Sequence, residues 1–157
     1  MAIFHFSAKV IGRSSGRSAV AAAAYRAGER LHDERIDRDH DFTNKAGVFH
    51  SEVILPKGAP EAFTDRATLW NAVEAAEKRK DAQLAREVEF ALPRELSKKD
   101  NVRLAREFVK AEFVGAGPFG GMIADLNVHW DIGEDEISMS IGISAKTARR
   151  SHMPTSC

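Results

Sequence analysis

The chain has 157 residues, enough for one domain with a sizeable core, and its 43% hydrophobic content is typical of a globular protein. Its 23 basic and 23 acidic side chains leave no net charge, and this sum alone argues against a dedicated nucleic-acid binder. No apolar run reaches the ~18 residues of a membrane span, no signal-peptide pattern is present, and the single cysteine, Cys157, excludes an internal disulfide. These features predict a cytoplasmic protein.

The basic residues are concentrated near the N-terminus. Within residues 1–30 the basic side chains are Lys9, Arg13, Arg17, Arg26 and Arg30, against Glu29 alone. A local excess of this kind can bind phosphates, with an affinity that falls as the salt concentration rises. We therefore take Lys9, Arg13, Arg17 and Arg26 as candidate nucleic-acid contacts. A capped flexible loop would explain Arg13 and Arg17 equally well.

The first helix is expected to follow a Ser/Gly/Arg loop. Ser18 is a good N-cap, residues 19–24 contain five alanines, and Gly28 offers a stop. Tyr25, the only tyrosine, falls on one helical stripe with very small side chains, so another molecule can approach its hydroxyl closely. From spacing alone, the alternative is a core aromatic with its hydroxyl at the rim.

Alternation of polar and apolar residues predicts the strands, and apolar spacing of three to four residues predicts the later helices. The expected strands are 3–11, 48–55, 86–92 and 122–132, the expected helices are 60–85 and 98–113, and 30–45 is expected to be an exposed loop. Three of the strands carry one polar face. The pattern predicts an α+β fold in which helices pack on the apolar face of a sheet and the polar face is functional.

Three motifs carry a resemblance to a known family. They are the opening M-A-I-F-H-F-S-A-K, then G-R-S-A-V-A-A-A-A-Y-R at residues 16–26, and R-E-V-E-F-A-L-P-R-E-L at residues 86–96. In this order, over residues 1–131, the chain resembles the MobA/MobL plasmid relaxases, which nick one DNA strand at a transfer origin during conjugation. The resemblance implies a His-metal-Tyr endonuclease-like antiparallel sheet, a relaxase-like domain at residues 1–132, and single-stranded origin-of-transfer DNA and relaxosome accessory proteins as partners.

The resemblance also implies roles for individual residues. Tyr25 occupies the place of the nucleophile, which would form a 5′-phosphotyrosine link. Because a free phenol has a pKa of about 10, a divalent metal (Mn²⁺ or Mg²⁺) or a base has to assist it. His129 matches the first of three metal-binding histidines, and Glu87 and Glu89 are candidate catalytic bases or carboxylates behind the metal ligands. Without the resemblance, His129 would be expected to hydrogen-bond its neighbours, and the glutamates to form a solvated edge.

The His-x-His pair expected after His129 is missing from the sequence. Residues 133–157 form a divergent tail, and synonymous codons can be chosen for residues 145–157 that restore P-H-x-H in another frame, which is compatible with a frameshifted, truncated relaxase gene. Residues 137–144 alternate apolar residues with Ser or Gly, predicting a replacement last strand with Ser138 and Ser140 near the missing histidines. Without its last strand the sheet would expose an edge.

We therefore expect weakened metal binding and impaired nicking, with binding of single-stranded DNA retained. The alternative is a non-catalytic DNA-binding or accessory remnant of a relaxase. A replication initiator of the wider superfamily is disfavoured because such proteins commonly place the tyrosine after the histidines. A purely helical structural protein is disfavoured by the polar-faced strands.

Overall fold

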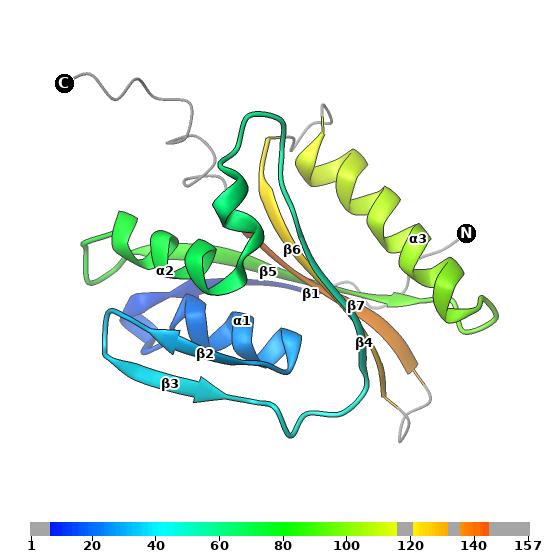
Figure 1. Cartoon of the computed structure of the whole chain (residues 1–157), viewed down its shortest axis with the longest axis horizontal. Coiled ribbons are helices and arrows are strands. Elements are labelled where there is room, and N and C mark those ends of the chain that lie inside the picture. Colours follow the sequence, from blue (N-terminus) through cyan, green and yellow to red (C-terminus); the bar gives the residue numbers. More distant parts are fainter. Residues whose placement is uncertain (1–6, 116–120, 132–135, 145–157) are drawn as a thin grey trace.

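The computed structural model describes residues 7–115, 121–131 and 136–144. Its main elements are β1 (Ser7–Gly12), α1 (Ala19–Ala27), β2 (Arg30–Asp33), β3 (Arg38–Asp41), β4 (Val48–Ile54), α2 (Arg66–Ala76), β5 (Gln83–Leu92), α3 (Lys98–Val109), β6 (Ile123–Asp131) and β7 (Glu136–Ser144) (Figure 1). In the described residues, five strands form an antiparallel sheet in the order β1-β5-β7-β6-β4, and β2 and β3 form a separate hairpin. The predicted α+β class and antiparallel sheet are confirmed.

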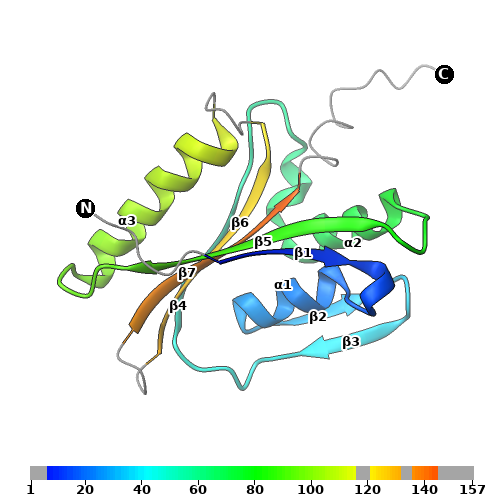
Figure 2. The ribbon, with the colours of Figure 1, turned by 180° about the vertical axis from the view of Figure 1, so that it is seen from behind.

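The last strand of the described chain, β7, occupies the centre of the sheet between β5 and β6 (Figure 2). Its apolar residues are buried in one core cluster with residues of α3, and these are Ile137, Met139, Ile141 and Ile143. Ser and Gly occupy the alternate positions and point to the other face. Residues 137–144 thus form the predicted replacement strand. The edges of the described sheet are β1 and β4, so no open edge arises at β7, and the strand after residue 132 belongs to the same folded unit.

The two faces of the sheet differ in what covers them. On the apolar face, Phe108 of α3 packs edge to face against Phe90 of β5, with ring centroids 5.1 Å apart. Over the other face lie α1 and α2, and Arg66 and Trp70 of α2 both bind the buried carboxylate of Asp125 in β6. The apolar face therefore carries the expected helical layer, α3. The polar face is covered in part by α1 and α2, and its uncovered part lies beside α1.

Helix α1 forms as the sequence predicts. The Ser18 hydroxyl accepts a hydrogen bond from the Ala21 N–H at 3.1 Å, and Gly28 ends the helix in the left-handed conformation, with φ 66°. Buried alanines let the helix approach the sheet closely, because they add no bulk between the two backbones. Tyr25 lies on the opposite stripe and is 55% exposed, which excludes the core-aromatic alternative.

Two expectations from the sequence are wrong in detail. Residues 30–45 are not a plain loop, because they contain the β2–β3 hairpin, in which Leu31 and Asp33 point inward and Asp37 takes a positive φ in the turn. The helix expected over residues 60–85 ends at Ala76, because the chain from Gln83 onward pairs with β1 instead. Among the described residues no helix is long and apolar enough to cross a membrane.

Candidate active site

A cleft of about 540 Å³ opens beside α1, between the β2–β3 hairpin and the polar face of the sheet. Of the residues predicted from sequence, it is lined by Lys9, Arg17, Tyr25, Arg26, Glu87 and Glu89. The sequence interpretation missed Arg35, Arg38 and His40 of the hairpin region, Lys45 and, as a cleft residue, Ser140 of β7. Cationic side chains outnumber carboxylates in this lining, so the cleft suits an anionic ligand.

Tyr25 stands at this cleft with its ring held on two sides. Phe42 packs edge to face against it, with centroids 5.3 Å apart, and the Lys45 ammonium lies 4.1 Å from the ring centroid. Because the rest of its stripe on α1 is Ser18, Ala21 and Ala22, the ring rises above a low surface that also lines the cleft. The phenol is thus supported at its faces and accessible from solvent.

His129 lies on the polar face of β6, opposite Ser138 of β7. Its Nε2 is 3.0 Å from the Ser138 Oγ, and its buried Nδ1 has no hydrogen-bond partner in the described structure. Burial lowers the pKa of His129, and the positive charge of Lys45 lowers it further. The imidazole is therefore held neutral near pH 7, which is the form that can bind a metal ion.

The two glutamates of β5 have different surroundings. Glu87 accepts a 2.6 Å hydrogen bond from Arg26, and Arg17 lies 3.8 Å from its other oxygen. Glu89 is exposed and pairs with no described side chain. Glu87 is thus engaged in fixing α1 to the sheet, whereas Glu89 is available to a bound molecule.

Arg26 positions α1 rather than facing solvent. Its side chain is 2% exposed and lies above Gly142 of β7, where an added Cβ would come within 2.3 Å of the guanidinium Nη2. Trp70 lies beneath the same group, with its ring 5.4 Å away, and the Asp125 carboxylate is 3.9 Å distant. Helix α1 therefore docks over β7 only because that strand has no side chain at residue 142.

Arg13 lies outside the cleft. Its guanidinium binds Glu74 of α2 and the main-chain oxygens of Glu77 and Arg79. These bonds tie the end of β1 to the end of α2 and leave this arginine unsuited to the DNA contact predicted for it.

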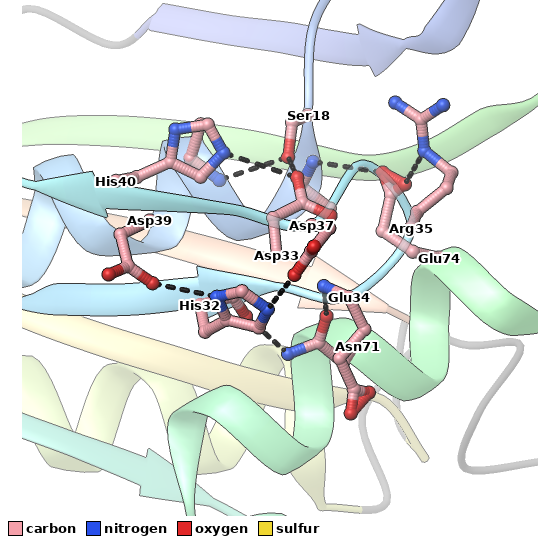
Figure 3. A network of polar contacts seen from close by, with 12 residues as sticks. Ser18, His32, Asp33, Glu34, Arg35, Asp37, Asp39, His40, Asn71 and Glu74 are labelled. Carbon is pink, nitrogen blue, oxygen red and sulfur yellow. Dashed lines mark hydrogen bonds and ion pairs between the residues drawn. The ribbon is translucent and has the colours of Figure 1, made fainter.

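A polar network supports the cleft wall behind α1 (Figure 3). The Ser18 hydroxyl donates to the buried Asp33 carboxylate at 2.6 Å, and His40 lies 3.2 Å from the same oxygen. Burial would raise the pKa of Asp33, but these hydrogen bonds outweigh it and lower the pKa overall. Arg35 reaches Glu74 at 3.3 Å, so the hairpin is fixed to both α1 and α2.

Comparisons with known proteins assign the chain to a family. The family model described as "MobA/MobL family" matches residues 17–139. The chain belongs to the MobA/MobL family. It is 50% identical over 129 residues to the "Mobilization protein MobL" of Acidithiobacillus ferridurans, covering 82% of this chain and 32% of that protein. It is 43% identical over 149 residues to the "Conjugal transfer protein TraA" of Rhizobium radiobacter, covering 88% of this chain and 13% of that protein.

A solved structure supports the same assignment. A chain from work on the "Molecular Basis of Vancomycin Resistance Transfer in Staphylococcus aureus" superposes with a TM-score of 0.81 at 34% identity, covering 91% of this chain and 70% of that one. The chain is thus a relaxase-family domain. It spans about a third or less of the two relatives from Acidithiobacillus and Rhizobium.

The MobA/MobL resemblance implies a metal held by three histidines, and the described residues do not fit that group. No cluster of three or more His, Cys, Asp or Glu side chains able to hold a metal occurs in the described ranges. Where β7 faces His129 it presents the Ser138 hydroxyl, and neutral serine is a poor ligand for these ions. Two further histidines of the sequence, His5 and His152, lie outside the described residues. The described donor set is one imidazole.

Proposed function

We propose that this chain is the DNA-strand-transfer domain of a plasmid mobilisation protein, and that it acts on single-stranded DNA at an origin of transfer. The observation that carries the proposal is the placement of the chain's single tyrosine, 55% exposed, in a cleft lined by basic side chains. Membership of the MobA/MobL family supports a role in mobilisation. A negatively charged strand fits this lining better than a neutral substrate does.

The proposed reaction is a transesterification. The Tyr25 Oη attacks phosphorus, and a bond forms between them while the bond from phosphorus to the 3′-oxygen breaks. The leaving oxygen keeps the bonding electron pair and takes up a proton, and the DNA 5′-phosphate stays on the tyrosine. The same steps in reverse reseal the strand.

The cleft supplies candidate groups for proton transfer and binding. We propose Glu89 as the acceptor of the phenol proton, because it lies exposed in the same cleft without a described side-chain partner. Lys9 and Arg17 also line the cleft and are the proposed contacts to neighbouring phosphates. Arg26 and Glu87 act as positioning residues, because their ion pair fixes the helix that carries Tyr25.

A second candidate function is DNA binding without cleavage. The observation that favours it is the serine opposite His129, which leaves the described residues without a three-ligand metal site. In this case the basic cleft would still hold a single strand, and the tyrosine would contact it without reacting.

One experiment separates the two candidates. The chain is incubated with a 3′-labelled single strand carrying the plasmid's own transfer origin, in Mg²⁺, in Mn²⁺ and in EDTA. A labelled adduct that survives SDS and is lost in Tyr25→Phe supports strand transfer. Salt-sensitive binding without an adduct under any of these conditions overturns strand transfer and supports the binding function.

A further inference from the structure

Lys45 connects the tyrosine to the histidine of the candidate site. Its Nζ donates to the main-chain oxygen of Tyr25 at 2.9 Å and lies 4.1 Å from the centroid of the Tyr25 ring. The same charge lies near enough to His129 to contribute to the lowered pKa of that imidazole. Tyr25 and His129 come from different elements, α1 and β6, and Lys45 is a cationic neighbour of both.

The backbone holds Lys45 in this place from both sides. On one side, Gly28 ends α1 against it, with an added Cβ at Gly28 only 3.6 Å from the Lys45 oxygen. On the other side, Gly47 has φ 95° and approaches β6 so closely that an added Cβ would lie 2.5 Å from the Trp130 oxygen. The Trp130 N–H donates to the Gly47 oxygen at 3.0 Å. The Cα of Lys45 is therefore held in a fixed position beside the cleft.

The ammonium of Lys45 has hydrogen-bonding capacity left for a ligand. In the described structure it donates to one main-chain oxygen and forms no ion pair, although an ammonium has three N–H donors. Burial lowers the pKa of Lys45, and the neighbouring Glu89 carboxylate partly offsets this effect. Arg26 differs, because its charge is already paired with Glu87 and its side chain is buried. A half-buried cation with unused donors, next to an exposed nucleophile, is suited to a phosphate.

We propose that Lys45 binds the DNA phosphate presented to Tyr25, within the cleft beside α1. This inference rests on the proposed function and deepens it, because it names the residue that holds the reacting group. A lysine ammonium binds phosphate as a point charge, and here it supplies positive charge where the described residues form no three-ligand metal site.

Another role for this side chain would be purely structural. A lysine near the last carbonyls of a helix stabilises the C-terminal end of that helix, and the bond to Tyr25 is of this kind. The two roles differ in what happens to DNA binding when the charge alone is removed. Lys45→Gln keeps an N–H donor for the Tyr25 oxygen and loses the charge, whereas Lys45→Arg keeps both.

The test is equilibrium binding of a fluorescent oligothymidylate to the whole chain over a range of salt concentrations. We expect Lys45→Gln to weaken binding about tenfold at low salt, as loss of one charged hydrogen bond does. The slope of log K against log salt should fall by about 0.7, the value for one phosphate contact on a single strand. Lys45→Arg should restore the slope. Lys57→Gln is the matched control, because this exposed lysine lies outside the cleft.

Each outcome decides the matter. A slope for Lys45→Gln equal to that of Lys57→Gln overturns the inference, whatever the melting temperature, and the strand-transfer proposal then stands or falls on the adduct assay. A reduced slope without any adduct from the unaltered chain supports Lys45 as a phosphate contact and overturns strand transfer. No binding of single-stranded DNA by the unaltered chain overturns both.

Discussion

Two regions of the molecule contrast sharply in the chemical groups that they present. One is the cleft at Tyr25, called the tyrosine side, and the other is the part of β6 and β7 around His129, called the histidine side. The tyrosine side, made by β1, α1, the hairpin and β5, presents an exposed phenol, several cations and two carboxylates. The histidine side, made by β6 and β7, presents the imidazole of His129 and the Ser138 hydroxyl, and neither of these residues lines the cleft. The histidine side is nevertheless well packed, since Met139 and Ile141 of β7 are fully buried. A strand can therefore satisfy the packing of a sheet through alternation and small residues alone, while metal binding requires particular side chains.

Asp125 joins the two sides, and its removal should have the largest effect on stability. This buried carboxylate accepts hydrogen bonds from Arg66 and from the Trp70 indole. Asp125→Ala leaves the buried Arg66 with only the partly exposed Glu29 as a carboxylate partner and leaves the Trp70 indole N–H without its acceptor. We therefore expect the free energy of unfolding to fall by about 3–5 kcal/mol. Urea unfolding measures this. Asp81→Ala, which breaks the exposed pair with Arg79, is the control and should leave stability unchanged.

Histidines placed in β7 would test directly whether the two sides differ in their metal-binding side chains. Ser138 and Ser140 occupy the face of β7 on which His129 lies, and the Ser138 hydroxyl already reaches its ring. We expect Ser138→His with Ser140→His to raise Mn²⁺ affinity by about tenfold for each imidazole, since each tenfold needs only about 1.4 kcal/mol. Titration calorimetry measures this affinity. Ser14→His, at an exposed position outside the sheet, is the control, and an equal gain there would contradict the placement of these residues.

Gly142→Ala tests how β7 accommodates the helix that carries Tyr25. The added Cβ would meet the Arg26 guanidinium at 2.3 Å and the Trp70 ring at 3.0 Å. Crowding of this kind should lower the free energy of unfolding by about 1–3 kcal/mol. At Gly12 the nearest atom to an added Cβ is 4.0 Å away, so Gly12→Ala is the matched control. Equal stability of the two variants would show that α1 does not depend on residue 142.

The smallest expected effect is the pH dependence due to His129. The pKa of His129 is lowered in the folded protein. At pH values below the ordinary histidine pKa, the unfolded chain therefore binds more protons than the folded chain. Stability should therefore fall as the pH drops through about 6.5 toward the lowered folded pKa. His129→Gln should lose less stability between pH 7 and pH 5 than the unaltered chain, measured by urea unfolding in EDTA. A steeper loss in the variant would contradict the burial of this ring.

Local patterns predicted the parts of the site that depend on one element. The Ser18 cap and the Gly28 stop fixed the bounds of α1, and alternation placed His129 on the polar face of its strand. Lys45 was missed because its position depends on the close approach of Gly47 to Trp130. No local pattern of polar and apolar residues indicates this contact. The pairing of Arg13 with Glu74 was not foreseen because the two residues are 61 positions apart in the sequence.

The β2–β3 hairpin was missed for a related reason. Its strands have four residues each, and their buried positions include Asp33 beside Leu31, so the alternation of polar and apolar residues that reveals other strands is absent. The inward Asp33 is stable there because Ser18 and His40, on different elements, bind it. Sequence spacing alone does not contain such long-range partners.

The most direct measurement is the identity of the residue that becomes bonded to DNA. The chain is incubated with a single strand carrying the transfer origin, treated with nuclease and trypsin, and analysed by tandem mass spectrometry. The account predicts a nucleotide linked through its 5′-phosphate to Tyr25, within the tryptic peptide from Ser18 to Arg26. A nucleotide on any other residue, or DNA that binds the cleft and leaves no modified peptide, would contradict it.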